Sequence, residues 1–426
     1  MGKKRLVVIG NGMAPGRALE RLFERAPDTF DVTIFNAEPR VNYDRIMLSP
    51  ILSGEKTFDE IVIHGDGWYV KHGVTLYKGS TVTSIDRATK TVTSARGLTE
   101  PYDKLIIATG SSPVILPVPG ASLAGVLTYR DLDDVQAMLL AAKSRGSAVV
   151  IGGGLLGLEA AAGLREQGMD VTVLHVMATL MERQLDPAAG LLLQGAVEAR
   201  GIRVITKAET KAILGGKSVE AVLLADGTRI PADLVVMAVG IRPSVGLAKD
   251  AGLTTARGIV VDASLRTSDP DIYAIGECAE AEGMTFGLVA PLYEMANVLA
   301  AQLAGDESSQ FKANATATKL KVTGIDLFSA GDFAAAADRE EIVIEDAATG
   351  VYQRLVLKDN RLIGAVLYGE TSDGGWYVDL IRSGADVSAI RDGLMFGPTY
   401  AFAKATPAAH GQSGGAMPAP SVAAAA

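Results

Sequence analysis

Two glycine-rich segments, about 140 residues apart, constrain this chain more than any other feature of its sequence. The first contains Gly10 and Gly12, the second contains Gly152, Gly154 and Gly157, and each lies between an apolar run and a segment of small residues. Glycines at this spacing between a strand and a helix form the turn that receives a dinucleotide pyrophosphate. One such segment is a weak signal, but two in this context predict that one polypeptide binds two dinucleotides.

The first segment departs from the fingerprint that the second one follows. Pro15 stands where the third small residue is expected, and Gly16 comes one position later. Proline is tolerated in the first helical turn because its missing N–H would have no partner within the helix. We therefore expect the first site to persist with a changed packing of the helix against the strand.

The apolar runs around both turns predict an α/β fold built from two βαβ units. A parallel strand that is buried on both faces reads as a continuous apolar run. Segment 272–276 is expected to return to the first sheet, and alternating strands after about residue 310 predict a third, α+β domain. The other expected strands are 5–10, 31–35, 104–110, 170–174, 234–240, 354–357 and 362–367 with one starting at 147, and the expected helices are 14–25 and a short one near 384–392.

Composition excludes several classes of function. With 426 residues, the chain is too long for one hydrophobic core, and its net charge of −9 argues against a nucleic-acid partner. The single Cys278 excludes a disulfide framework, a four-thiolate iron–sulfur cluster and a redox dithiol. The histidines show no metal-binding spacing, so we expect no metal. The N-terminus enters a strand directly and no apolar run could span a bilayer, which favours a cytoplasmic protein without a membrane partner.

Further motifs complete a likeness to a known family. With Ala108-Thr109-Gly110, Gly240 at the end of an apolar run and Gly276-Glu277, residues 4–305 resemble the two-dinucleotide flavoproteins of the pyridine nucleotide-disulfide oxidoreductase superfamily. The resemblance implies two Rossmann-like dinucleotide-binding domains, one inserted in the other, and a C-terminal α+β interface domain. It implies an FAD domain at 1–116 and 241–308, an NAD(P) domain at 117–240 and the interface domain at 309–404. The composition of 405–426 predicts a disordered tail.

Several stretches are most similar to one member of this superfamily, the FAD/NAD module of the assimilatory NAD(P)H nitrite reductase large subunit. They are residues 10–13, 38–46, 180–186, 288–294 and 318–331. That subunit continues into iron–sulfur and sirohaem domains, for which this sequence has no cysteine ligands. The resemblance thus implies an NADH-dependent FAD oxidoreductase that delivers electrons to a redox protein of nitrite or nitrate assimilation.

Two other functions stay open. The chain could be a rubredoxin or ferredoxin reductase of another pathway, although Pro50 follows Ser49 where those reductases carry a lysine. It could also be a slow flavin-binding regulatory protein, but a protein that only holds flavin needs no nicotinamide site. A homodimer through the C-terminal domain is compatible with the fold-level likeness.

Candidate catalytic residues follow from the resemblance. It implies that Glu159 lies near the nicotinamide and that Arg45 lies near the flavin. The structural alternatives are a buried helix-face acid satisfied by a neighbour for Glu159 and a surface salt bridge for Arg45. Spacing from the first turn predicts that Glu38 accepts from ribose hydroxyls, its alternative being an ordinary loop carboxylate.

The remaining cofactor contacts are less specific. Glu277 stands where the family has an aspartate that binds the flavin ribityl chain and phosphate. His175 ends the second strand of the second unit, where an acidic residue would favour NADH; its alternative is an exposed histidine, and the lack of a nearby arginine still favours NADH over NADPH. Lys319 and Lys321 could border the flavin or lie on a solvated edge strand, and Cys278 is expected to be a small packed residue. The other expected contacts are Met13, Ala14, Val82, Ala108, Thr109, Gly110, Leu155, Leu156, Gly240 and Gly276.

Overall fold

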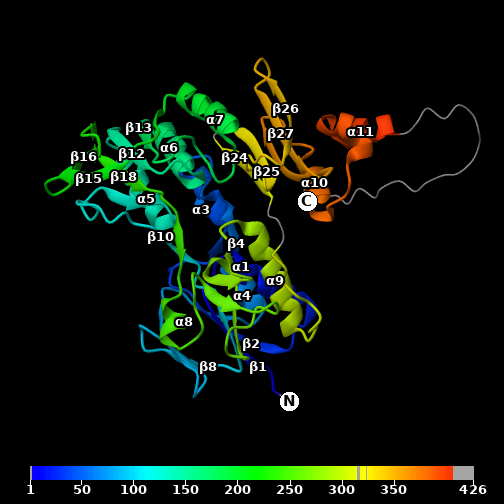
Figure 1. Ribbon diagram of the computed structural model, residues 1–426. Coiled ribbons are helices and arrows are strands. Elements are labelled where there is room, and N and C mark those ends of the chain that lie inside the picture. Colours follow the sequence, from blue (N-terminus) through cyan, green and yellow to red (C-terminus); the bar gives the residue numbers. More distant parts are fainter. Residues whose placement is uncertain (1, 314–316, 323, 406–426) are drawn as a thin grey trace, which may run out of the picture. The chain divides into compact units, whose positions relative to one another are not determined.

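A computed structural model of the chain describes residues 2–313, 317–322 and 324–405 (Figure 1). The chain separates into two compact units, Met1–Leu327 and Phe328–Ala426. The finer division of the first unit at residues 116, 240 and 308 stays a prediction. Of the predicted disordered tail, residue 405 ends a helix and residues 406–426 lie outside the described residues.

The first βαβ unit forms a five-stranded parallel sheet with the order β21-β9-β1-β2-β5. Its strands are β1 (Lys4–Ile9), β2 (Phe30–Phe35), β5 (Thr75–Tyr77), β9 (Lys104–Ile107) and β21 (Ile272–Ala274). Ile272 pairs with Leu105 of β9, so the predicted return of this segment to the first sheet is confirmed. The middle strand β1 is apolar because it lies between two neighbours and is covered on both faces.

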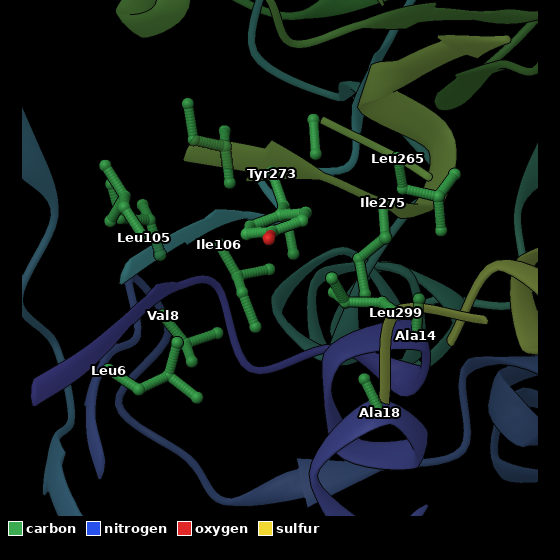
Figure 2. Packing of buried hydrophobic residues seen from close by; sticks show 14 of the residues in the cluster. Leu6, Val8, Ala14, Ala18, Leu105, Ile106, Leu265, Tyr273, Ile275 and Leu299 are labelled. Atoms are coloured by element: carbon green, nitrogen blue, oxygen red, sulfur yellow. The ribbon is translucent and has the colours of Figure 1, made fainter. Parts of the chain in front are cut away.

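Helix α1 (Met13–Arg25) follows β1 and packs against α9 (Val289–Leu303). Figure 2 shows Ala14 and Ala18 of α1 beside the buried core that includes Leu299 and Tyr273. Small side chains on this face of α1 allow the helix to approach the sheet closely, which places its first turn at the carboxyl end of β1.

The second βαβ unit forms another five-stranded parallel sheet, with the order β11-β18-β12-β13-β14. Its strands are β11 (Val126–Thr128), β12 (Ser147–Ile151), β13 (Asp170–Leu174), β14 (Arg203–Ile205) and β18 (Leu234–Met237). Helices α5 (Leu132–Ala142), α6 (Leu155–Glu166) and α7 (Pro187–Ala199) connect them. The two sheets confirm the predicted α/β class.

Two antiparallel strands join the halves of the larger unit. β10 (Ser111–Pro113) leaves the first half and β19 (Ile241–Pro243) returns to it, with Ser111 paired to Pro243. The chain therefore enters and leaves the second parallel sheet side by side, as an inserted domain requires.

Short elements complete the larger unit. The remaining strands are β3 (Asn42–Tyr43), β4 (Val62–His64), β6 (Val82–Asp86), β7 (Thr91–Ser94), β8 (Thr99–Pro101), β15 (Thr210–Gly215), β16 (Val219–Leu224), β17 (Arg229–Pro231), β20 (Ile259–Val261), β22 (Ala279–Ala281) and β23 (Met284–Thr285). The remaining helices are η1 (Arg45–Met47), α2 (Leu48–Ser53), α3 (Phe58–Ile61), α4 (Asp66–Lys71), α8 (Gly246–Asp250) and η2 (Gly276–Cys278).

The C-terminal part of the chain contains a sheet with the order β24-β25-β28-β27-β26. Its strands are β24 (Thr318–Val322), β25 (Ile325–Gly331), β26 (Glu340–Asp346), β27 (Val351–Lys358) and β28 (Arg361–Tyr368). Helix α10 (Gly374–Ser383) packs on β28 and is followed by η3 (Ser388–Phe396) and α11 (Gly397–Ala405). The predicted strands 354–357 and 362–367 lie within β27 and β28.

The predicted helix near 384–392 is only partly correct, because residues 388–392 are helical and residues 384–387 are not. Helix α10 ends at Ser383 because Gly384 adopts a left-handed conformation with φ of 59°, which stops a helix. The next helical segment begins only at Ser388 and is a 3₁₀ helix. The structure therefore has two helical elements here: α10 ends just before the predicted start at residue 384, and η3 begins four residues after it.

Candidate dinucleotide sites

The first glycine turn leaves β1 and enters α1. Gly10 has φ of 109°, and a Cβ there would lie 2.2 Å from the carbonyl oxygen of Ala108, so glycine is required. Gly12 is the N-cap of α1; a Cβ there would meet nothing within 4 Å, and no side chain caps the helix. Uncapped amides at a helix N-terminus fit a pyrophosphate. Met13 and Ala14 are the first residues of this helix.

The structure explains the displaced glycine of the first fingerprint. A Cβ on Gly16 would lie 3.0 Å from Nδ2 of Asn42, because the Asn42 side chain lies against α1 at this position. Nδ2 of Asn42 donates to the carbonyl oxygens of Asn11 (2.8 Å) and Gly12 (2.7 Å). Asn42 therefore holds the backbone of the turn, and Gly16 leaves room for it. Pro15 is buried in the first helical turn, as the sequence allows.

A second buried side chain supports this arrangement. The hydroxyl oxygen of Tyr69 accepts from the side-chain amide of Asn11 (3.0 Å) and from the backbone N–H of Asn42 (3.2 Å). Asn42 and Tyr69 are both buried. Sequence analysis missed both residues, although Asn42 lies in the stretch 38–46 that carries the family likeness.

The structure brings Glu38 and Arg45 together. Glu38 accepts from the Tyr43 hydroxyl at 2.7 Å and forms an ion pair with the Arg45 guanidinium. The same guanidinium donates to the carbonyl oxygen of Arg130 at 3.2 Å. Both side chains of the pair are partly buried, so the ion pair of Arg45 is not a fully exposed surface salt bridge. Their roles toward a cofactor stay predictions.

A second carboxylate lies at the carboxyl ends of β9 and β21. Glu277 accepts from the Ser111 hydroxyl at 2.9 Å and forms an ion pair with Arg130. Gly110 (φ of 66°) lies beside this pair, and Gly276 (φ of 85°) precedes Glu277. Ligands of parallel α/β sheets bind at these strand ends, so the cluster is suitably placed for a flavin dinucleotide. Arg130 is a member that sequence analysis missed.

Other residues predicted for the first site are placed less closely. Ala14 lies near Gly276, since a Cβ on that glycine would be 3.4 Å from Ala14 Cβ. Thr109 donates to the carbonyl of Ser244 at 2.8 Å. Val82 is buried in β6, which belongs to a separate antiparallel sheet. Lys319 has an exposed side chain on β24. The side chain of Lys321 lies outside the described part of the structure.

The second glycine turn repeats the first in β12 and α6. Gly152 has φ of 125°, and a Cβ there would lie 2.2 Å from the carbonyl oxygen of Ala238. A Cβ on Gly157 would lie 2.0 Å from the carbonyl oxygen of Gly152, so α6 rests directly on the turn. Gly154 is the uncapped N-cap of α6 and has nothing within 4 Å of its Cβ position. The turn fits a second pyrophosphate.

Three further residues predicted for this site lie at the start of α6 and after β18. Leu155 and Leu156 are the first residues of α6, and Leu156 is 37% exposed. Gly240 follows β18 with φ of 118° and has nothing within 4 Å of its Cβ position.

His175 is buried, so the alternative of an exposed histidine is wrong. Its Nδ1 accepts from the backbone N–H of Gly153 at 3.1 Å, and its Nε2 lies 3.0 Å from Oε2 of Glu182. Sequence analysis placed His175 at the end of the strand correctly, but it had no signal for Glu182.

Glu159 connects the two halves of the larger unit. Its Oε2 accepts from the Ser49 hydroxyl at 2.7 Å, and Ser49 Oγ lies 2.9 Å from the Tyr129 hydroxyl. Ser49 belongs to α2, which packs on α6. Burial raises the pKa of Glu159 to about 7, and the hydrogen bond from Ser49 opposes this shift. Between residues that the structure describes, no ion pair with Glu159 forms.

Replacing Glu159 by glutamine is expected to change how stability depends on pH. The folded protein holds this proton up to about pH 7, whereas the unfolded chain releases it near pH 4.5. The stabilisation is thus complete below pH 4.5 and is lost as pH rises through 7. Between mildly acidic and mildly alkaline pH, the free energy of unfolding of the wild type should therefore fall by roughly 2 kcal/mol more than that of Glu159→Gln.

This prediction can be checked by denaturant unfolding of the flavin-loaded proteins at both ends of that pH range. Glu166→Gln, an exposed position on the same helix, is the control and should retain the wild-type dependence. Equal pH dependence in the wild type and Glu159→Gln would contradict a raised pKa.

Cys278 is packed, as predicted. The thiol is fully buried, and its Sγ lies 3.3 Å from the carbonyl oxygen of Ile275. Among the described residues, no three histidine, cysteine, aspartate or glutamate side chains gather as a metal site would require. The helices in that part of the chain are also too short or too polar to cross a membrane.

Two parallel sheets, each with an uncapped helix behind a glycine turn, define a protein with two dinucleotide sites. The chain belongs to the pyridine nucleotide-disulphide oxidoreductase family, whose model matches residues 4–305. The model of the rubredoxin NAD+ reductase C-terminal domain matches residues 317–385. These matches confirm the predicted fold class, the oxidoreductase class and the cofactors FAD and NAD(P)H.

Individual relatives point in the same direction. The chain is 47% identical over 388 residues to the NAD(P)H nitrite reductase of Bacillus subtilis, covering 91% of this chain and 48% of that protein. It is 43% identical over 395 residues to the assimilatory nitrate reductase electron transfer subunit of the same organism, covering 93% and 51%. The chain spans about half the length of these relatives. The predicted likeness to the FAD/NAD module of nitrite reductase is thereby confirmed.

A solved structure is similar over nearly the whole chain. Putidaredoxin reductase, in its covalent complex with putidaredoxin, superposes with a TM-score of 0.84 at 25% identity, covering 95% of this chain and 99% of that chain. The architecture is therefore one that operates with a redox protein in that relative.

Proposed function

We propose that this protein accepts a hydride from NADH and passes the electrons through FAD to a redox protein of nitrite or nitrate reduction. The observation that carries the proposal is the pair of open glycine turns in one compact unit, joined by the antiparallel strands β10 and β19. The relatives named for nitrite reduction and for nitrate reductase electron transfer support the choice of pathway. Action in the cytoplasm and a homodimer belong to the same proposal.

The residues of the chain mainly position the reactants. FAD and NADH, when bound, supply the hydride chemistry, so the protein contributes orientation and electrostatics. The N-termini of α1 and α6 would hold the two pyrophosphates. Glu38, paired with Arg45, would receive ribose hydroxyls, and Glu277, oriented by Arg130, would orient the flavin side chain. Lys319 is assigned no step.

Glu159 would fix the geometry between the two sites. It comes from the nicotinamide half, and its partner Ser49 comes from the flavin half, so their hydrogen bond ties the halves together. Cys278, the only cysteine of the sequence, is buried. These 426 residues therefore hold no thiol pair through which electrons could leave. The electrons would pass instead from the flavin to an acceptor centre outside these residues.

The first experiment is anaerobic stopped-flow absorbance of the flavin-loaded protein with NADH and with NADPH. Rapid bleaching by NADH, followed by turnover with a nitrite or nitrate reductase component, is expected. Bleaching without such turnover, but with turnover of rubredoxin or ferredoxin, would favour the second candidate. The match to the rubredoxin reductase C-terminal domain supports that candidate. A flavin that neither nucleotide bleaches would contradict both and leave a flavin-binding regulatory role.

A further inference from the structure

The residue that follows β13 differs from that of a standard nicotinamide site. In a dinucleotide fold of this kind, an acidic residue at the end of the second strand accepts from the adenosine ribose hydroxyls and selects NADH, whereas a nearby arginine selects NADPH. Here the strand is followed by His175-Val176-Met177, so the sequence position itself provides neither charge.

The hydrogen bonds of His175 determine which ring nitrogen carries the proton. Nδ1 accepts from the backbone N–H of Gly153 at 3.1 Å, so this nitrogen is unprotonated. Nε2 therefore carries the hydrogen in the neutral ring and donates it to Oε2 of Glu182 at 3.0 Å. The ring lies directly against the backbone of Gly153, because a Cβ on that glycine would be 2.7 Å from the ring's Cγ.

The residue before Glu182 is also hydrogen-bonded to the glycine turn. The N–H of Met181 donates to the carbonyl oxygen of Gly153 at 3.0 Å, and Leu180 is fully buried. The side chain of Glu182 is still 32% exposed, so its carboxylate keeps an open edge. A carboxylate thus stands next to the turn of the second site, although it lies eight residues beyond Leu174, the last residue of β13.

We infer that Glu182 is the specificity-determining residue that favours NADH over NADPH, and that His175 is its positioning residue. This inference rests on the proposed function, since it concerns the nucleotide of the same site. The carboxylate would accept from the ribose hydroxyls of NADH. The 2′-phosphate of NADPH would face the same negative charge, which discriminates by repulsion.

Two cations near this position could oppose the carboxylate. Lys207 lies close, because its backbone N–H donates to the carbonyl oxygen of Met177 at 3.0 Å, and Arg183 is the exposed neighbour of Glu182. Within the described chain, the side chain of Glu182 is hydrogen-bonded to His175, and neither cation pairs with it. The carboxylate therefore keeps its charge for a ligand. Lys207 is the residue through which the opposite preference could arise.

The test measures Kd for NAD+ and NADP+ and flavin reduction by NADH and NADPH in the flavin-loaded protein. Glu182→Gln keeps the shape and removes the charge, and it is expected to lower the preference for NAD(H) about 10-fold, chiefly through tighter binding of NADP(H). His175→Gln should shift the preference in the same direction by a smaller factor. Glu198→Gln, an exposed position on α7, is the matched control and should leave both constants unchanged.

Three results would overturn the inference: an unchanged preference in Glu182→Gln, a wild type that prefers NADP(H) until Lys207→Ala removes that preference, or no binding of either nucleotide. The proposed function fails separately, when both nucleotides bind but neither reduces the flavin. In that case the Kd values for NAD+ and NADP+ alone test whether Glu182 determines the nucleotide preference.

Discussion

Replacing Gly157 by alanine is expected to slow flavin reduction by NADH about 100-fold while the protein keeps its FAD. A Cβ at this position would lie 2.0 Å from the carbonyl oxygen of Gly152 and 3.5 Å from Ala238 Cβ. Gly157 is not in the left-handed region, so the effect is purely a contact between α6 and its own turn. To relieve the contact, α6 must move away from β12, and a displacement near 1 Å misaligns the nicotinamide.

The measurement is single-turnover bleaching of the flavin, with the flavin absorbance itself reporting that the first site is intact. Gly195→Ala on α7 is the matched control: a Cβ there would meet nothing within 4 Å. It should reduce at the wild-type rate and gain up to about 1 kcal/mol of stability, because alanine is the better helix former. Wild-type reduction rates and NAD+ affinity in Gly157→Ala would contradict a nucleotide site at this turn.

The fold could be predicted from the sequence because its signals are local. Buried parallel strands appear in the sequence as apolar runs, and Gly10 and Gly152 stand where the turn approaches a carbonyl oxygen too closely for a side chain. The helix near 384–392 was misplaced because the stop at Gly384 was not separated from the helical signal on either side. The predicted return of 272–276 was correct because an apolar strand has to pair within a sheet.

The site could be predicted only in part, since its contacts join residues distant in sequence. Ser49 and Glu159 are 110 positions apart, and Arg130 and Glu277 are 147 apart. No periodicity links such residues, so the partners of the predicted carboxylates cannot be predicted from the sequence. The sequence leaves an exposed position open for His175 because its hydrogen-bond partners, Gly153 and Glu182, carry no signal that links them to it.

A related limit applies to the first fingerprint. The sequence shows that Gly16 is displaced, but only the structure shows that the side chain of Asn42 takes the space beside it. The departure thus reflects a different support for the turn, and the site is retained. This support can be tested separately from the turn.

Replacing Asn42 by alanine is expected to weaken FAD binding by about 10- to 100-fold. The amide of Asn42 is fully buried and satisfies the carbonyl oxygens of Asn11 and Gly12. Without it, the buried carbonyl oxygen of Asn11 loses its donor, at a cost of about 1–3 kcal/mol, and the carbonyl oxygen of Gly12 keeps only the N–H of Gly16. The turn would then shift to reach other donors, and the amides at the start of α1 would move with it. Kd for FAD, measured by ultrafiltration and flavin fluorescence, reports this displacement.

Gln302→Ala is the control that separates a local effect on the glycine turn from a general loss of protein stability. Gln302 is also buried, and its amide also donates to two backbone carbonyls, those of Glu307 (3.3 Å) and Ser309 (2.6 Å), but these belong to the turn after α9. It should lower the unfolding free energy to a similar extent and leave Kd for FAD unchanged. Tyr69→Phe, which removes only the hydroxyl behind Asn11, should weaken FAD binding more mildly. Equal losses of FAD affinity in the Asn42 and Gln302 variants would mean that Asn42 acts through general stability alone.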